Sequence, residues 1–209
     1  LGALLAGHPK MCPYIDMPLQ HLDVEALRRM RRPWPCLNVA RLVERLRERI
    51  PDLAVRTTMM VGFPGEDRRA FQRLLDGVRQ IRFDRLGAFT FSAEQHTPAA
   101  AMNNRPSRRT ALRRLDRLMR LQAGIAADLS ASQIGRTVRV LVDAVERDGK
   151  NVTAEPKKII YVGRTKRDAP DVDGVVRFRS DRPLEIGSFV EVRITAAETH
   201  DLIGECLPS

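Results

Sequence analysis

A strand that runs directly into a glycine-rich turn and then a helix is the feature that most limits how this chain can fold. Residues 54–62 form an apolar run, Phe63-Pro64-Gly65-Glu66 follows, and a helical pattern begins at Arg68. A continuous apolar run of this length is typical of a strand in a parallel sheet. Glycines at such a strand end let a ligand approach the backbone, and the next helix offers unpaired N–H groups to an anion.

Three residues of this turn are candidate ligand contacts: Gly62, Gly65 and Glu66. The two glycines would bring the backbone close to a cofactor, and Glu66 would accept hydrogen bonds from an amine or a ribose hydroxyl. The same residues also suit a purely structural turn, in which Glu66 is only a favourable charge near a helix N-terminus. The spacing alone leaves both interpretations open.

The residues around the turn alternate between strand and helix patterns. This order of strands and helices predicts right-handed parallel units, and therefore an α/β sheet or part of a barrel. Asp23 and Asn38 are expected to cap two of the helices. The predicted elements are a strand at 12–19, helices at 24–32 and 39–50, a strand at 54–62, a helix at 68–81 and a strand at 85–92.

A second candidate stretch lies on the first of these strands, at Tyr14-Ile15-Asp16-Met17-Pro18-Leu19-Gln20-His21. Asp16 and Gln20 share one face of a strand and would point into a barrel lumen. Alternatively, Asp16 pairs with a neighbouring arginine and His21 caps the following helix.

A long amphipathic helix is predicted from about residue 107 to 132, with Ser107 as its cap. Apolar residues and Gln122 recur on one face at intervals of three or four, and arginine dominates the other face. This pattern favours a linker that packs on a barrel, and the alternative is an RNA-binding rod.

After Gly135 the pattern changes to a period of two, which is typical of strands. Asp148-Gly149 marks a hairpin turn. Five short strands in about 75 residues fit a small closed β-barrel of the OB type. The sequence therefore predicts two domains, residues 1–132 and 134–209. The expected strands are 138–142, 159–162, 174–178, 189–195 and 201–206.

Charge is distributed unevenly over the 209 residues. The net charge is +10, yet residues 134–209 contain 13 Lys plus Arg and 13 Asp plus Glu, a net charge of zero. This balance argues against a strongly RNA-seeking C-terminal module. The basic front part suits RNA or a ribosome surface, although solvated arginine-rich helix faces explain it equally well.

The three cysteines, Cys12, Cys36 and Cys206, are widely spaced. They form no pattern typical of a disulfide framework, a zinc site or an iron–sulfur site, so we expect reduced thiols in a cytoplasmic protein. No apolar stretch approaches the roughly 18 residues that span a bilayer, and no membrane partner is expected.

An acidic loop is predicted at residues 164–174 between two barrel strands. Asp168, Asp171 and Asp173 lie within six residues of each other, held by Pro170 and Gly174. Such a loop repels phosphate and suits a basic protein partner, or it is only a solvated connector.

Taken in order, these motifs resemble the methylthiotransferases of the radical S-adenosylmethionine superfamily. The acidic loop resembles the aspartate methylthiotransferases of the RimO type more than their tRNA-modifying relatives of the MiaB type. The matching stretches are Pro18-Leu19-Gln20-His21, Met30-Arg31-Arg32-Pro33, Thr57-Thr58, Gly62-Phe63-Pro64-Gly65-Glu66, Phe83-Asp84-Arg85-Leu86-Gly87, Thr97-Pro98-Ala99, Leu118-Met119, Leu121-Gln122 and a closing barrel like a TRAM domain.

The resemblance implies methylthiolation of an aspartate β-carbon on the twelfth protein of the small ribosomal subunit, with the ribosome or rRNA as a further contact. It implies S-adenosylmethionine as a cofactor, and two [4Fe–4S] clusters in a full-length enzyme that is a monomer. Gly62, Gly65, Glu66 and Gln20 would line the S-adenosylmethionine site, and Asp168, Asp171 and Asp173 would face the protein partner. No catalytic residue is identified.

The chain departs from the family pattern in its cysteines. The family has three cluster cysteines in an N-terminal domain and a C-x-x-x-C-x-x-C triplet at the start of the barrel, and Cys12, Cys36 and Cys206 match none of them. The chain therefore resembles the C-terminal half of such an enzyme: a partial TIM-like barrel, then the TRAM domain. Trp34 and His96 also stand where the family pattern has glycine.

We expect that these residues alone bind no iron and cleave no S-adenosylmethionine, which anaerobic cluster reconstitution followed by absorption spectroscopy tests. A stoichiometric [4Fe–4S] spectrum would contradict this expectation. A partial barrel also exposes a sheet edge and apolar surface, so poor solubility is expected. The alternative functions are a tRNA adenosine methylthiotransferase and a non-catalytic TRAM module that binds RNA or the ribosome.

Overall fold

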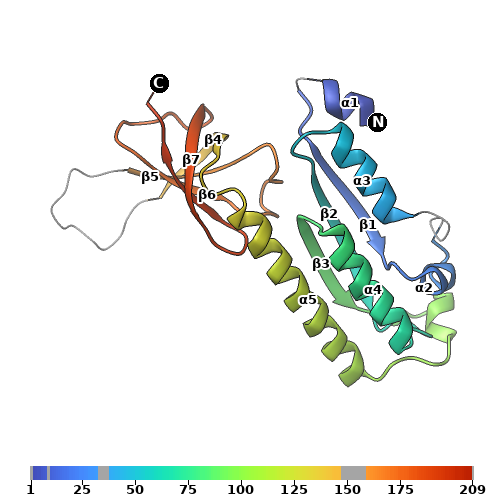
Figure 1. Ribbon diagram of the computed structural model, residues 1–209. Helices are drawn as coiled ribbons and strands as arrows, with labels where there is room; N and C mark the ends of the chain where they lie inside the picture. Colours follow the sequence, from blue (N-terminus) through green and yellow to red (C-terminus); the bar gives the residue numbers. More distant parts are fainter. Residues whose placement is uncertain (1, 9, 33–37, 147–158, 209) are drawn as a thin grey trace. The chain divides into compact units, whose positions relative to one another are not determined.

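The computed structural model describes residues 2–8, 10–32, 38–146 and 159–208 (Figure 1). The chain divides into two compact units: one comprises Leu1–Met11 and Ile15–Ile125, and the other comprises Cys12–Tyr14 and Ala126–Ser209. The boundary lies within a long helix. The predicted domain limits, 1–132 and 134–209, stay a prediction.

The first unit combines helices with a three-stranded sheet, in the predicted order from its first strand to its long helix. An additional short helix at its start was not predicted. The elements are α1 (Gly2–Gly7), β1 (Tyr14–Gln20), α2 (Val24–Arg29), α3 (Val39–Arg49), β2 (Ala54–Val61), α4 (Arg68–Ile81), β3 (Arg85–Thr90), a 3₁₀ turn η1 (Pro98–Ala101) and α5 (Arg108–Ala131).

Side-chain caps fix the starts of α2, α3 and α4. Asp23 accepts from the Ala26 N–H at 2.9 Å, Asn38 from the Arg41 N–H at 3.0 Å, and Asp67 from the Ala70 N–H at 2.7 Å. These bonds satisfy helix N–H groups that have no partner within the helix. The capping roles predicted for Asp23 and Asn38 are confirmed.

Helix α2 ends at Arg29, earlier than the predicted residue 32. Arg31 takes a left-handed conformation with φ 54°, and the Arg32 N–H reaches back to the Leu27 carbonyl at 2.9 Å. This is the Schellman type of helix ending, which usually places glycine at the left-handed position. The predicted helix was too long because an arginine, and not the usual glycine, takes the left-handed conformation that ends it.

The sheet has the order β1-β2-β3, and β2 and β3 are parallel. In β2, Val55, Met59 and Val61 are buried, whereas Thr58 and Met60 on the alternate face are partly exposed. Helices α3 and α4 lie side by side over one face of the sheet (Figure 1). Phe89 of β3, paired in register with Met60, remains 42% exposed, so the other face is only partly covered.

A partly buried ion pair connects α3 to Asp84, the residue before β3. Arg47 donates to Asp84 at 3.1 Å and to the carbonyls of Ile81 and Arg82 at 2.6 and 2.8 Å, where α4 ends. Asp84 also accepts from the Val55 N–H of β2 at 2.9 Å. These contacts supply hydrogen bonds that the end of α4 and the start of β2 would otherwise lack.

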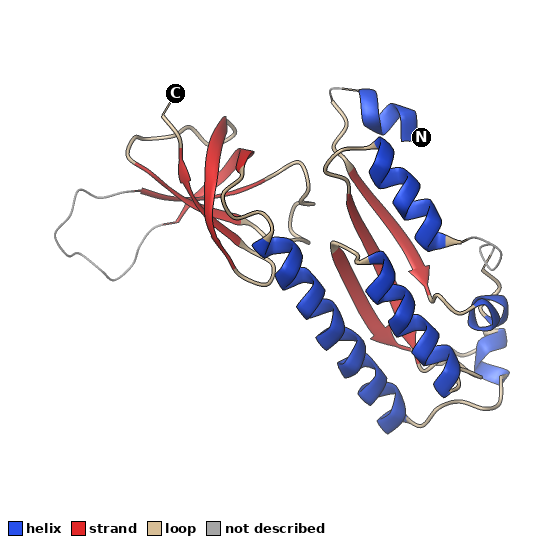
Figure 2. Cartoon of the chain, in the orientation of Figure 1, coloured by secondary structure: helices blue, strands red, loops and turns tan. Residues whose placement is uncertain are grey.

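The second unit contains a closed barrel with the strand order β4-β5-β6-β8-β7. Figure 2 colours its strands red, as it does those of the first unit, and they follow the long helix α5 in the chain. The strands are β4 (Thr137–Glu146), β5 (Ile159–Arg164), β6 (Val176–Ser180), β7 (Phe189–Ala197) and β8 (Leu202–Cys206). The predicted five-stranded barrel closed by the last strand is confirmed. The predicted turn at Asp148-Gly149 lies outside the described residues.

Alternate residues of the barrel strands form one core: Val140, Val142, Tyr161, Val176, Phe178, Val192 and Ile194. The Tyr161 hydroxyl accepts from the Leu184 N–H at 2.8 Å, so the largest of these side chains buries no unsatisfied oxygen. Gly163 lies where a Cβ atom would be 2.2 Å from the Leu141 carbonyl oxygen, and it therefore permits the close approach of β4 and β5.

Candidate cofactor site

The glycine turn has the predicted strand–turn–helix geometry. Strand β2 ends at Val61, Gly62 and Gly65 have φ of 79° and 78°, and α4 begins at Arg68. The Glu66 N–H closes the turn by donating to the Phe63 carbonyl at 2.9 Å. Both glycines occupy the left-handed region, which other L-residues adopt only at a cost of roughly 1–2 kcal/mol.

Packing also favours glycine at both positions, more strictly at Gly62 than at Gly65, where the neighbour is the end of a flexible side chain. A Cβ atom at Gly62 would lie 2.7 Å from the Cβ of Ala111 in α5, and one at Gly65 would lie 3.0 Å from the guanidinium of Arg29. Arg29 in turn donates to the Gly65 carbonyl at 2.9 Å, and the Gly65 N–H donates to the Asn104 carbonyl at 2.9 Å. Contacts within the protein therefore account for the glycines without any ligand.

The Glu66 side chain is fully buried. Its carboxylate accepts from the N–H groups of Gly62 and Phe63, the kind of backbone cradle that often holds an external anion. Burial raises the pKa of this carboxyl, and the nearby Arg114 and the N–H groups oppose that rise. The turn thus carries an anion of its own.

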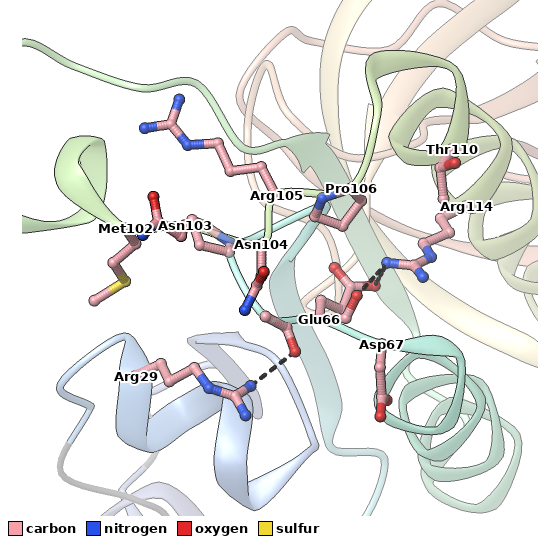
Figure 3. Close-up of a pocket in the computed structure, with 12 residues that line it drawn as sticks. Arg29, Glu66, Asp67, Met102, Asn103, Asn104, Arg105, Pro106, Thr110 and Arg114 are labelled. Carbon is pink, nitrogen blue, oxygen red and sulfur yellow. Dashed lines mark hydrogen bonds and ion pairs between the residues drawn. The ribbon is translucent and has the colours of Figure 1, made fainter.

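Arg114 of α5 is the charged partner of this carboxylate. Its Nη1 lies 3.2 Å from Glu66 Oε1 and donates to the Glu66 backbone carbonyl at 2.8 Å (Figure 3). The Oε1 contact is an ion pair without hydrogen-bond alignment, which leaves that oxygen dependent on charge for its stabilisation. Sequence reasoning assigned the arginines of this helix to its solvated face and missed Arg114, which lies three residues after the buried Ala111.

Two pockets adjoin the turn. The larger, about 770 Å³, is drawn in Figure 3 and includes Gly65 and Glu66 among its lining residues. The smaller, about 210 Å³, is lined by Gln20, Met60 and Phe63 together with residues of η1 and of the end of α2. Arg29 and Met102 line both pockets. The structure therefore does not bring Gln20 and Glu66 into one pocket.

The carboxyl end of β1 contributes Gln20 to the smaller pocket. Gln20 is 8% exposed and has φ 70°, and among the described residues its side chain makes a long 3.5 Å contact from the amide nitrogen to the Pro18 carbonyl. Asp16, on the same strand, forms an ion pair with Arg56 of β2. The alternative that a neighbouring arginine satisfies Asp16 is therefore confirmed.

His21, directly after Gln20, is completely buried. Its Nδ1 accepts from the Asp23 N–H at 2.9 Å. Desolvation by burial lowers the pKa of His21 to about 4; Asp23 opposes the shift, and the charges of Arg114 and Arg73 add to it. The imidazole is therefore neutral at pH 7 and supports the start of α2, as the structural interpretation predicted.

The predicted acidic loop folds back on itself. Asp168 accepts from the N–H and hydroxyl of Thr165 at 3.1 and 2.6 Å, and Asp173 accepts from the Ala169 N–H at 2.9 Å. Asp171 is exposed, with a left-handed φ of 61°. Two of the three carboxylates thus shape the loop, and the role of all three in partner binding stays a prediction.

His96 has φ 64°, a conformation that favours glycine. The resemblance to the methylthiotransferases places glycine at this position, and the backbone keeps the conformation that glycine would adopt. Trp34, the other position where glycine is expected, lies outside the described residues.

In the part of the chain that the structure describes, no group of three or more His, Cys, Asp or Glu side chains is arranged to hold a metal ion. Cys12 is exposed and Cys206 partly exposed, both as free thiols, and Cys36 lies outside the described residues. No described helix combines the length and apolar character needed to cross a bilayer.

This geometry defines a class of protein: a parallel α/β unit with a glycine turn, followed by a small closed barrel. Residues 134–207 match the family model of the TRAM domain. Relatives named ribosomal protein uS12 methylthiotransferase RimO are similar to almost the whole chain. The protein from Desulforamulus reducens is 42% identical over 201 residues, 96% of this chain and 44% of the relative. That from Roseiflexus castenholzii is 44% identical over 205 residues, 98% and 41% respectively.

The chain thus spans less than half the length of the curated relatives it matches. Over nearly its whole length it corresponds to a part of the RimO methylthiotransferases that includes their TRAM domain. The predicted resemblance to the C-terminal half of such an enzyme is confirmed.

Proposed function

We propose that this chain is part of an enzyme that transfers a methylthio group to the β-carbon of an aspartate on ribosomal protein uS12. The observation that carries the proposal is the identity of 42–44% across 96–98% of the chain to relatives named for this activity. Such an enzyme acts in the cytoplasm, where ribosomal proteins are made, and as a monomer.

The three-stranded sheet belongs, in this proposal, to a TIM-like barrel of the radical S-adenosylmethionine type. A parallel sheet is normally covered on both faces. Here α3 and α4 cover one face, while Thr58, Met60 and Phe89 remain partly or largely exposed on the other. In the closed barrel that face would line the lumen.

The smaller pocket is the better candidate for S-adenosylmethionine. It lies at the carboxyl ends of β1 and β2, where α/β proteins usually bind ligands. Gln20 offers an amide for a ribose or amino-acid group, and Met60 and Phe63 offer apolar surface for an adenine ring. When bound, S-adenosylmethionine supplies the radical source and the methyl group.

Gly62, Gly65 and Glu66 would act on this pocket by fixing the backbone that carries Phe63. Glu66 holds the N–H groups of Gly62 and Phe63, and Arg29 holds the Gly65 carbonyl. Phe63 packs edge-on against Phe91, with ring centroids 5.0 Å apart, which further limits its freedom. In this proposal these residues position the pocket wall.

The iron–sulfur clusters do not fit the residues present. The three cysteines are too widely spaced in sequence for a cluster triplet, and the described residues contain no group of three or more His, Cys, Asp or Glu side chains that could hold a metal ion. No chemical step through a cluster is therefore assigned to this chain. Asp168, Asp171 and Asp173 would face the basic ribosomal protein, with the TRAM barrel as a further contact to protein or rRNA.

A chimera tests the proposed function. The matching segment of the Desulforamulus reducens relative is replaced by this chain, and the product is expressed in a bacterial strain that lacks its own RimO. We expect mass spectrometry of the ribosomal proteins to show the methylthio group restored on the uS12 aspartate. The intact relative is the positive control, and the empty vector is the negative control.

Two results would contradict the proposal. If uS12 stays unmodified in cells that contain folded chimera, the chain does not support the proposed activity. A methylthio group on tRNA adenosine, found by nucleoside mass spectrometry in a strain that lacks both activities, would assign the chain to the tRNA-modifying type instead.

A further inference from the structure

We propose that Arg114 of α5 is a positioning residue for the cofactor pocket, acting through the buried Glu66 carboxylate on the backbone of Gly62 and Phe63. This inference rests on the proposed function, because it concerns the same pocket. It adds a residue that lies on neither the glycine turn nor β1.

Glu66 and Arg114 are both shielded from solvent. The Glu66 side chain is fully buried, and Arg114 is 12% exposed. A carboxylate in such a place needs a charged partner and hydrogen bonds to remain ionised. Arg114 supplies the charge, and the N–H groups of Gly62 and Phe63 supply the hydrogen bonds. The ionised carboxylate and its two N–H partners therefore depend on one another.

Phe63 connects the Glu66 carboxylate to the smaller pocket. Its ring lines the smaller pocket, and its N–H is one of the groups that Glu66 holds. Loss of the negative charge on Glu66 weakens both hydrogen bonds, because charge-assisted bonds are about twice as strong as neutral ones. The Phe63 backbone then becomes more mobile, and the pocket wall that the Phe63 ring forms becomes more mobile with it.

The packing of α5 holds Arg114 in place. Ala111, one turn earlier in α5, lies against Gly62, and Leu118 one turn later is completely buried. Further along the same helix, Gln122 donates to the Phe83 carbonyl at 2.8 Å. Packing of α5 therefore places the guanidinium beside Glu66, and Figure 3 shows Arg114 directed toward that residue.

Arg117 offers a matched control on the same helix. The guanidinium carbons of Arg114 and Arg117 both lie 5.4 Å from the centroid of the Phe71 ring, but only Arg114 forms an ion pair with Glu66. Arg117→Gln thus removes an equal charge and an equal aromatic contact without touching the turn.

The test uses the 209-residue chain, with S-adenosylmethionine as the probe. Isothermal titration calorimetry measures the dissociation constant, circular dichroism verifies that each variant is folded, and amide hydrogen exchange reports protection at Gly62 and Phe63. For Arg114→Gln we expect a dissociation constant about tenfold higher and exchange at both amides about tenfold faster, the size of effect that one charge-assisted hydrogen bond provides. Arg117→Gln should change neither.

Two further variants separate positioning from general stability. Arg114→Lys keeps the charge and should restore most of the binding, whereas a residue needed only for packing would not be rescued by charge. Should Arg114→Gln fail to fold, the double variant Glu66→Gln with Arg114→Gln removes the uncompensated buried charge. It should still show the faster exchange and the weaker binding.

Unchanged binding and unchanged exchange in folded Arg114→Gln would overturn the inference. If the unmodified chain fails to bind S-adenosylmethionine, the proposed cofactor pocket fails, and with it the role of Arg114 there. The exchange measurement, which needs no ligand, still shows whether Arg114 holds the turn, so the two failures are distinguishable.

Discussion

Gly62→Ala is expected to lower the free energy of unfolding of the sheet-containing unit by about 2–5 kcal/mol. The left-handed φ of 79° costs a residue with a Cβ atom roughly 1–2 kcal/mol. The new methyl group would lie 2.7 Å from the Ala111 Cβ, and overpacking of this kind costs about 1–3 kcal/mol. Urea denaturation followed by far-UV circular dichroism measures the loss, since most of the helical residues that report it belong to this unit.

Gly124→Ala is the matched control, because Gly124 lies within α5 and nothing would contact its Cβ atom within 4 Å. It should raise stability by about 0.5–1 kcal/mol through the better helix propensity of alanine. Adding Ala111→Gly to Gly62→Ala removes the clash but leaves the backbone strain, and the new glycine costs α5 about 0.5–1 kcal/mol of helix propensity. The double variant should therefore recover only part of the loss. A destabilisation below about 1 kcal/mol in Gly62→Ala would show that α5 does not hold the turn closely.

The order of the elements followed from the sequence because the signals are local. Buried runs, helical periodicity and the caps Asp23 and Asn38 each act within a few residues, and they place β1 to α5 close to their observed bounds. The alternation in the last 75 residues predicted the barrel for the same reason. The end of α2 was missed because Arg31 takes a left-handed conformation without being glycine.

The candidate site followed from the sequence only in outline. The glycine turn was predicted, but the direction of the Glu66 side chain depends on Arg114, which is 48 residues away in the chain. The two pockets likewise depend on how α2, η1 and the turn meet, with Arg29 between them. Contacts of this kind are tertiary, and no spacing within the turn encodes them.

Both interpretations of the turn are useful. The structural one explains the glycines, through positive φ and close packing, and it explains Glu66 as an internal anion. The ligand-binding interpretation still applies to Phe63 and Gln20, which line the smaller pocket at the ends of β1 and β2. A turn that is fixed by its own buried charge is a rigid support for a pocket wall, so the two roles are compatible.

His21 is expected to make the sheet-containing unit sensitive to acid, with a loss of about 2–3 kcal/mol between pH 7 and about pH 4.5. Burial lowers the pKa of His21 in the folded chain to about 4, below the 6.5 of an unperturbed histidine. The folded state therefore favours the neutral ring, and this contribution to stability is complete above pH 6.5. It is lost as the pH falls from 6.5 towards 4, because the unfolded chain binds the proton first.

His21→Asn separates this effect from the titration of carboxylates. The asparagine oxygen can accept the Asp23 N–H in place of Nδ1, but it does not titrate. Urea denaturation of both chains at the two pH values should therefore show a fall about 2–3 kcal/mol smaller in the variant. His96→Asn, at an exposed position, should leave the fall unchanged. Equal falls in the unmodified chain and His21→Asn would mean that His21 binds its proton without opening the unit. In that case the buried ring would have a partner for its Nε2, an atom with none in the described part of the chain.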